Sequence, residues 1–386
     1  MIYNFDLCPE RRGTESLKWR AYAEDVLPMW VADMDFVSPE PVLRALHERV
    51  EHGVFGYPSD MFELRQVFVE RLERLYGWCV SPDDLVFVPG VVTGVNLACH
   101  ALAAPGGAGL VQTPVYPPFL SAPANAGIAR QDAGLVRMDD GSYQIDLDAF
   151  ESAITDHTRL FVLCNPHNPV GRVFQKAELE GLAEICLRRG VVICSDEIHC
   201  DLIFSGHRHI PIASLHPEIA QNTITLMAPS KTFNIAGLKF SVAIIPNADL
   251  RKKFSGAEKG LAGWVNVMGL VAGLAAYRDG QEWLDQLLVY LETNRDCLHG
   301  YANSQLPGVK MALPEGTYLA WLDCRNSGID GCPSEFFIKH GRVALNDGSA
   351  FGPGGDGFVR LNFGCPRGML MEGLDRMRKA LLQINS

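Results

Sequence analysis

The 386-residue sequence contains no apolar run of the roughly 20 residues that a membrane-spanning helix requires. It also lacks internal repeats, low-complexity stretches and an excess of positive charge, since its net charge is −11. We therefore expect neither a membrane partner nor a nucleic-acid partner, because nucleic-acid binding needs a basic surface. Residues 1–6 have neither the basic nor the apolar region of a secretory signal, which predicts a cytoplasmic protein.

The 11 cysteines form no closely spaced pairs, and they are scattered from Cys8 to Cys365. An odd number without metal-binding spacing argues against a disulfide framework and against a zinc site. Cys164 and Cys194 lie within apolar stretches, where cysteine behaves as a small hydrophobic residue. This usage indicates a reducing compartment.

The chain is too long for one hydrophobic core, because single cores stop growing beyond roughly 250–300 residues. Its centre alternates short apolar runs with amphipathic stretches, which predicts an α/β fold with a mostly parallel central sheet buried on both faces. The strands are predicted at residues 85–88, 109–112, 159–164, 191–195, 223–228 and 239–245. The predicted organisation is a large domain at 46–281, a smaller α+β domain at 282–386, and an N-terminal segment at 1–45 that packs on the small domain.

Lys231 follows an apolar strand in the run Ala-Pro-Ser-Lys-Thr-Phe-Asn, residues 228–234. A lysine at the end of a buried strand loses its proton more easily than a solvated one, so it suits a Schiff base with pyridoxal phosphate (PLP). By itself the segment fits a solvated loop lysine better, because most lysines that follow strands are solvated. The other motifs have to decide between the two interpretations.

Two further motifs follow predicted strands. Gly90, Val91 and Val92 lie between a strand and a helix, where free N–H groups and the helix dipole favour a phosphate, although a plain helix start has the same pattern. Residues 165–171 read Asn-Pro-His-Asn-Pro-Val-Gly, and the two Asn-Pro pairs predict a stiff turn that can contain cis bonds. A buried Asn168 amide in this turn can bind a ligand oxygen.

Two charged residues are predicted within apolar strands. Asp196 ends the strand 191–195, where a buried carboxylate needs a partner such as a protonated pyridine nitrogen, or else caps a helix. Arg360 interrupts an apolar strand, and its fork suits a carboxylate or a structural ion pair. His199 fits a ligand contact or a packed core histidine. The run Gly-Pro-Gly-Gly-Asp-Gly at 352–357 matches G-x-G-x-x-G, but a strand follows it instead of a helix, which excludes dinucleotide binding.

Taken together and in this order, the motifs resemble the fold-type I PLP enzymes of the aminotransferase class I/II superfamily over nearly the whole chain. More narrowly, the chain is similar to the MalY/PatB branch of cystathionine β-lyase-like C–S lyases. The segments that carry this narrower similarity are residues 28–36, 56–57, 196–199, 230–238, 316–323 and 364–367.

The resemblance implies a role for each candidate in holding the cofactor ring. Lys231 would form the Schiff base and then act as general base and acid. Asp196 would pair with the pyridine N–H, and Asn168 would bind the phenolate oxygen. Tyr116 would stack on the ring. Arg360 would bind the α-carboxylate of an amino-acid substrate.

The phosphate group of PLP is expected on other residues. The resemblance places it on the N–H groups that follow Gly90, at Val91 and Val92, with Ser230 nearby. Tyr57 would reach the phosphate in the neighbouring subunit, which implies a homodimer with shared active sites.

Two positions depart from the wider aminotransferase pattern. His199 stands where most members have a tyrosine near the phenolate oxygen, and Lys239 stands where many have a phosphate-binding arginine. A lysine can supply a point charge but not the bidentate geometry of arginine.

The resemblance implies β-elimination on L-cystathionine or a related S-substituted L-cysteine, which yields a thiol, pyruvate and ammonia. Transamination is the alternative, because Lys231, Asp196 and Arg360 would serve both reactions. A third hypothesis is a PLP-binding regulatory or interaction protein. Residues 30–36 and His199 favour the lyase.

Overall fold

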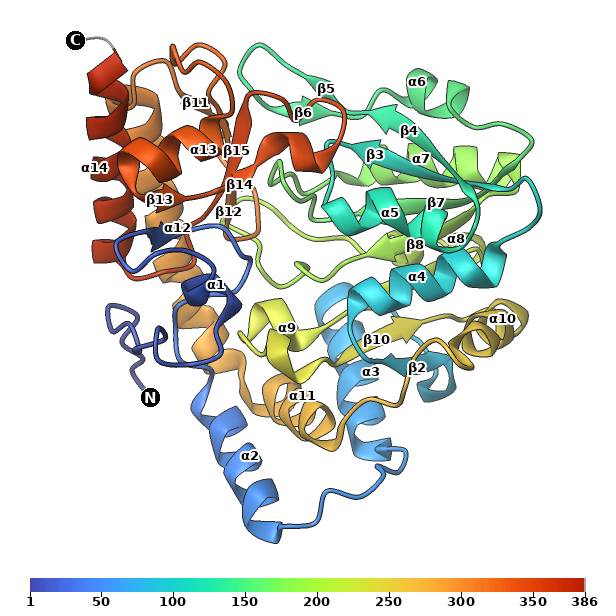
Figure 1. Ribbon diagram of the computed structural model, residues 1–386. Coiled ribbons are helices and arrows are strands. Elements are labelled where there is room, and N and C mark those ends of the chain that lie inside the picture. The colour runs from blue at the N-terminus through green and yellow to red at the C-terminus, as the bar shows by residue number, and fades with distance from the viewer. Residues whose placement is uncertain (385–386) are drawn as a thin grey trace.

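The largest sheet of the computed structural model, which describes residues 1–384, has seven strands (Figure 1). Their bounds are β2 Leu85–Val88, β3 Ala108–Thr113, β4 Ala129–Gly134, β7 Thr158–Cys164, β8 Val192–Asp196, β9 Thr223–Met227 and β10 Ser241–Ile244. They lie in the order β2-β10-β9-β8-β7-β3-β4. Among these strands β10 alone runs in the opposite direction to the other six, which confirms the prediction of a mostly parallel sheet.

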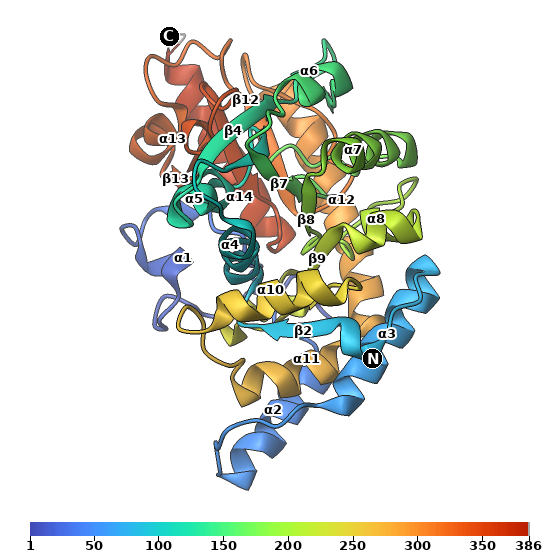
Figure 2. The same cartoon turned by 90° about the vertical axis from the view of Figure 1, so that its right-hand side faces the viewer.

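Alternate residues of the central strands enter two different hydrophobic clusters, so both faces of the sheet are covered. In β7, Phe161 and Leu163 pack toward one cluster, and Leu160 and Val162 pack toward another. Helices α4 Val91–Leu102 and α5 Pro117–Asn125 lie on one side of these strands, and α7 Lys176–Arg189 and α8 Pro217–Gln221 lie on the other (Figure 2). This double coverage explains why the strands are continuously apolar.

The remaining helices of this part of the chain complete the two faces and the edge near β2. Their bounds are α2 Glu40–His52, α3 Phe62–Tyr76, α6 Leu147–Ser152, α9 Pro229–Thr232, α10 Ala248–Glu258 and α11 Val267–Asp279. Helix α10 packs against α4, and α11 packs against α2 and α3. A short hairpin joins β5 Val136–Arg137 to β6 Tyr143–Gln144.

A second, antiparallel sheet follows in the C-terminal part. Its strands are β11 Lys310–Met311, β12 Leu319–Asp323, β14 Asn346–Asp347 and β15 Phe358–Asn362 in the order β11-β12-β15-β14. Helices α12 Gln281–Gln305 and α14 Arg367–Ile384 lie side by side next to it (Figures 1 and 2), and α13 Pro333–Phe336 is a single turn. Within residues 1–384 no helix is both long and apolar enough to cross a membrane.

The N-terminal residues contain one helical turn, α1 Leu17–Arg20, and one short strand, β1 Leu27–Pro28. Strand β1 pairs in parallel with β13 Val343–Ala344. Phe5 packs its ring edge-on against Trp283 of α12. These contacts tie the N-terminus to C-terminal elements, while domain boundaries at 45 and 281 stay predictions.

Candidate active site

Five segments deliver side chains to one cavity of about 180 Å³. The parallel strands β2, β3, β7, β8 and β9 all end at the same edge of the sheet, so the residues that follow them converge there. Nine of the predicted cofactor residues line the cavity together with Lys239. They are Gly90, Val91, Val92, Tyr116, Asn168, Asp196, His199, Ser230 and Lys231, of which the last is the predicted Schiff-base lysine.

Lys231 lies on the short helix α9, where the sequence suggested an irregular loop. Its Nζ donates a hydrogen bond to the backbone oxygen of Ala32 at 2.5 Å. Removal from water lowers the Lys231 pKa to about 8, with the positive charges of Arg360 and Lys239 acting in the same direction. The neutral amine is therefore far more abundant near physiological pH than it is for a solvated lysine.

Asp196 also lines the cavity, from the last position of β8. Burial raises the pKa of this carboxyl to about 7, and the adjacent Glu197 adds to the rise. Its Oδ1 accepts a hydrogen bond from the Ile198 backbone at 3.0 Å. A buried carboxyl of this kind is stabilised in its charged form by a cationic N–H partner.

His199 lies beside these groups with its ring 2% exposed, and its Nδ1 atom is buried without a hydrogen-bond partner. Burial lowers the His199 pKa to about 3, and the charges of Lys231 and Arg360 lower it further. The imidazole is therefore neutral at physiological pH. An unpaired polar atom in a cavity wall is the kind of group that a bound polar ligand satisfies.

The turn after β2 presents backbone N–H groups to the cavity. Gly90 adopts φ +105°, a conformation that favours glycine, and it precedes the first turn of α4. The helix begins at Val91, so the N–H groups of its first turn have no partners within the helix. This end of the cavity suits an anion such as a phosphate group.

The doubled Asn-Pro turn places Asn168 between the cavity and β15. Both peptide bonds that precede its prolines, at Pro166 and Pro169, are cis, as the sequence allowed. The Oδ1 atom of Asn168 accepts a hydrogen bond from Arg360 at 3.1 Å. Tyr116 comes from the turn after β3, and its backbone N–H bonds the Asn168 carbonyl at 3.1 Å.

Arg360 is buried in β15 and reaches the site through Asn168. Its terminal nitrogens donate to Asn168, to Asn346 Oδ1 at 2.6 Å and to the Trp30 carbonyl at 3.0 Å. Its Nε–H is buried without a partner. The structural ion pair that the sequence left open is not formed within the described residues, because every bond of this guanidinium goes to a neutral acceptor.

Tyr57 does not line this cavity. Its side chain is 90% exposed, and its ring meets Trp264 edge-on at 5.2 Å in a separate, open groove. The sequence had placed Tyr57 in the neighbouring subunit's site, and its distance from this chain's own cavity leaves that prediction open.

Residue-by-residue reasoning from the sequence missed two contributors to the site. Ala32 lines the cavity and bonds Lys231, and Tyr318 donates to the same Ala32 carbonyl at 2.8 Å. Both lie in segments that carried the resemblance to C–S lyases. Neither could be assigned a role from the sequence. Every residue has a backbone carbonyl, so the residue type at position 32 does not reveal which donors that carbonyl binds.

Residues 26–377 match the aminotransferase class I and II family, and the chain belongs to that family. Along 98% of its length it is 43% identical to the cystathionine β-lyase PatB of Bacillus subtilis, all of which is covered. A PLP-bound C–S lyase from Staphylococcus hominis matches 99% of each chain with 36% identity and a TM-score of 0.94. An aspartate aminotransferase of Pyrococcus horikoshii is 26% identical over 93% of this chain and 91% of its own. The resemblance to the cystathionine β-lyase branch is thereby confirmed.

Proposed function

We propose that this chain is a PLP-dependent C–S β-lyase. It converts L-cystathionine, or a related S-substituted L-cysteine, and water to a thiol, pyruvate and ammonia. The observation that carries the proposal is one cavity that combines the Lys231 amine, the Asp196 carboxyl and the N-terminus of α4. Full-length similarity to named cystathionine β-lyases supports elimination over transamination.

The residues of the cavity fit PLP at each of its functional groups. Lys231 would be joined to its aldehyde carbon, and Asp196 would accept its pyridine N–H. The α4 N-terminus at Val91 and Val92 would bind the phosphate, with Ser230 and Lys239 lining the same cavity. When bound, PLP supplies an electron sink for negative charge at the substrate Cα.

The substrate carboxylate is expected at Arg360. The unpartnered Nε–H is a donor that a carboxylate would satisfy, and the neighbouring N–H groups already fix the orientation of the guanidinium. Burial lowers the Arg360 pKa to about 10, so the group stays charged at physiological pH. A charged donor in a buried site makes a strong hydrogen bond with a carboxylate.

Lys231 is expected to move the protons of the reaction. The neutral amine takes the proton from Cα, and the electron pair of that bond remains on the carbon. When the Cβ–S bond breaks, the electron pair leaves with sulfur, and a proton completes the thiol. A lysine pKa of about 8 keeps both protonation states accessible for these steps.

Transamination and a purely regulatory role predict different results from the lyase in a turnover assay. We expect purified, PLP-loaded protein given L-cystathionine alone to release thiol and pyruvate continuously in equal amounts. A protein that turns over only after a keto acid is added would be an aminotransferase, and a protein that binds PLP without any turnover would support the regulatory hypothesis. The Lys231→Ala variant is the control, and it should be inactive under both conditions.

We further propose a homodimer with shared active sites and a cytoplasmic location. Tyr57 and Trp264 are both exposed in a groove lined mainly by apolar residues, and exposed apolar surfaces are typical of interfaces. This would leave Tyr57 free to reach the phosphate of the partner's cofactor. All 11 cysteines are unpaired, which supports a reducing compartment.

A further inference from the structure

Residues 29–36 have no regular secondary structure and contribute Ala32 to the cavity wall, yet their backbone is held at closely spaced points. The amide of Asn362 donates to the carbonyls of Val31 and Asp33 at 2.6 and 2.7 Å. The amide of Asn234 bonds both the N–H and the carbonyl of Met34, at 2.9 and 3.0 Å. This segment, called here the 29–36 segment, therefore bridges β15 and the lysine-bearing region.

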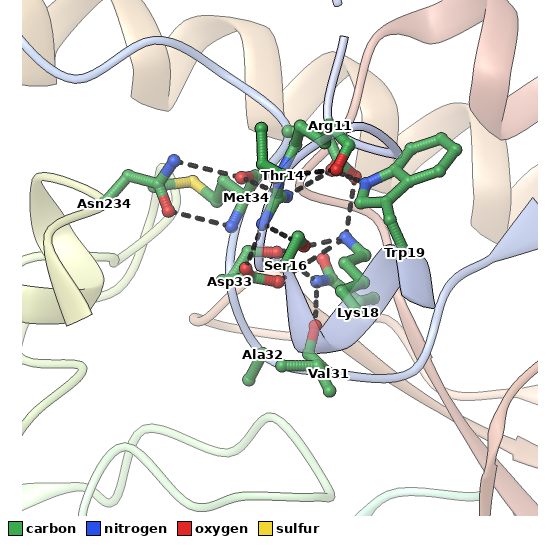
Figure 3. Close-up of polar contacts among 12 residues, drawn as sticks. Arg11, Thr14, Ser16, Lys18, Trp19, Val31, Ala32, Asp33, Met34 and Asn234 are labelled. Atoms are coloured by element: carbon green, nitrogen blue, oxygen red, sulfur yellow. Dashed lines mark hydrogen bonds and ion pairs between the residues drawn. The ribbon is translucent and has the colours of Figure 1, made fainter. Parts of the chain in front are cut away.

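Charged side chains fix the 29–36 segment from its other side. Arg11 bonds Asp33 and Asp35, each at 2.5 Å, and Lys18 bonds Asp35 at 2.6 Å. Figure 3 shows Arg11 and Lys18 on one side of Asp33 and Met34, and Asn234 on the other. Lys18 and Asp35 are both fully buried, and Arg11 is a second cationic partner of Asp35, so the charges at this point of the segment are paired.

Ala32 lies at the centre of the 29–36 segment, and its carbonyl oxygen accepts two hydrogen bonds. Lys231 Nζ donates from one side at 2.5 Å, and Tyr318 Oη donates at 2.8 Å. A carbonyl oxygen has two lone pairs, so the two donors are compatible. Tyr318 is fully buried, and its ring packs edge-on against His199 at 5.9 Å.

We propose that the Ala32 carbonyl, held by the Tyr318 hydroxyl, is the acceptor that orients the free Lys231 amine for proton transfer. Tyr318 is then a positioning residue for the lysine. This inference rests on the proposed role of Lys231 as general base. With one N–H directed at Ala32, the amine has its lone pair and its other N–H available for the substrate.

Lys231 and Tyr318 would donate to the Ala32 carbonyl at different stages of the reaction. Lys231 would no longer donate to Ala32 while its nitrogen is joined to a cofactor, and a buried carbonyl without a donor is costly. Tyr318 keeps that carbonyl paired and in place, so the lysine returns to a preformed acceptor. After Lys231 takes the Cα proton, its ammonium form donates to the same oxygen, which is a charge-assisted bond.

Tyr318→Phe tests the inference with little risk to folding, because the ring contact with His199 is kept and Lys231 still donates to Ala32. A misplaced reacting group lowers rate much more than binding, so kcat should fall roughly 10- to 100-fold while KM for L-cystathionine changes less than about 3-fold. Tyr301→Phe, which removes a hydroxyl bonded to Asp375 far from the cavity, is the matched control and should keep wild-type kcat.

A second readout uses the full-length protein stripped of PLP. The Lys231 amine is titrated by NMR of labelled lysines, with Lys231→Ala used to assign its signal. A loosened acceptor favours the ammonium form less, so the Lys231 pKa in Tyr318→Phe should lie below the wild-type value of about 8. An unchanged or raised Lys231 pKa, or an unchanged kcat, would overturn the inference.

The two proposals fail in different ways. If Lys231→Ala retained lyase activity, the proposed function of Lys231 would be wrong. If Lys231→Ala were inactive while Tyr318→Phe matched the wild type in kcat and in the Lys231 pKa, only the positioning role of Tyr318 would be wrong.

Discussion

At the scale of single residues, the site depends on two ionisable groups whose pKa values are moved toward each other. Burial lowers the pKa of Lys231 to about 8 and raises that of Asp196 to about 7. A lysine near neutrality is a competent base, and a buried carboxyl needs a cation to be charged. Both shifts reflect charged forms that burial destabilises, so the proposed pyridine N–H at Asp196 would stabilise the ionised carboxylate.

The raised pKa of Asp196 predicts a pH-dependent cost in the protein without PLP. Below about pH 4 the carboxyl is protonated in both the folded and unfolded states and contributes nothing. Between about pH 4 and 7 the unfolded chain releases the proton and the folded chain retains it, so the free energy of unfolding falls as pH rises. Above pH 7 the loss is complete.

Asp196→Asn removes this cost, because asparagine cannot ionise. We expect the PLP-free variant to be more stable than PLP-free wild type at pH 8, by about 2–4 kcal/mol at roughly 1.4 kcal/mol per pKa unit, and to lose that advantage at pH 4. Urea unfolding at both pH values measures it. The exposed Asp148→Asn is the control, and an equal pH dependence in wild type and Asp196→Asn would refute a raised Asp196 pKa.

At the scale of secondary-structure elements, the sequence predicted the buried parts of the sheet well. The predicted strands at 191–195 and 223–228 match β8 and β9 to within one residue at each end. These elements have apolar runs that end at clear breaks. Strand β4 was missed because it is a sheet edge with the polar sequence Ala-Arg-Gln-Asp-Ala-Gly and mostly exposed side chains.

Elements set by distant contacts could not be predicted. The direction of β10 depends on its pairing between β2 and β9, which the local pattern does not encode. The 29–36 segment is fixed by amides more than 190 residues away, at Asn234 and Asn362. The hydrogen bond from Lys231 to Ala32 of this segment was therefore visible only in the structure, although the residues of the segment carried the family resemblance.

At the scale of the whole molecule, the site is assembled from N-terminal, central and C-terminal parts of the chain. Arg360 of β15 and Lys231 of α9 meet through the backbone of the 29–36 segment, at Trp30 and Ala32. Tyr57 is the exception, because it is exposed and lies in another groove. A second copy of the chain would give this residue a function.

The proposed homodimer predicts distinct effects for the two exposed aromatic residues. Trp264→Glu places a charge on a side chain that is 71% exposed in one chain and should shift the mass in solution from dimer to monomer. Tyr57→Phe should keep the mass and weaken PLP binding about 10-fold, the loss of one charge-assisted hydrogen bond. Sedimentation equilibrium and PLP titration measure these effects.

Val289→Glu is the control for added charge. It changes an exposed residue of α12, outside the groove that contains Trp264, and the variant should remain dimeric. A wild-type protein that is monomeric at micromolar concentration would contradict the proposed sharing of active sites.

The claim on which the rest depends is that Lys231 is the amine that binds PLP. Borohydride treatment of the PLP-loaded protein fixes the cofactor on the lysine to which it is joined, and peptide mass mapping then identifies that residue. The account predicts the added mass on the peptide that contains Lys231, with none on Lys239, which lines the same cavity. Cofactor fixed on Lys239 or on any other lysine would contradict it.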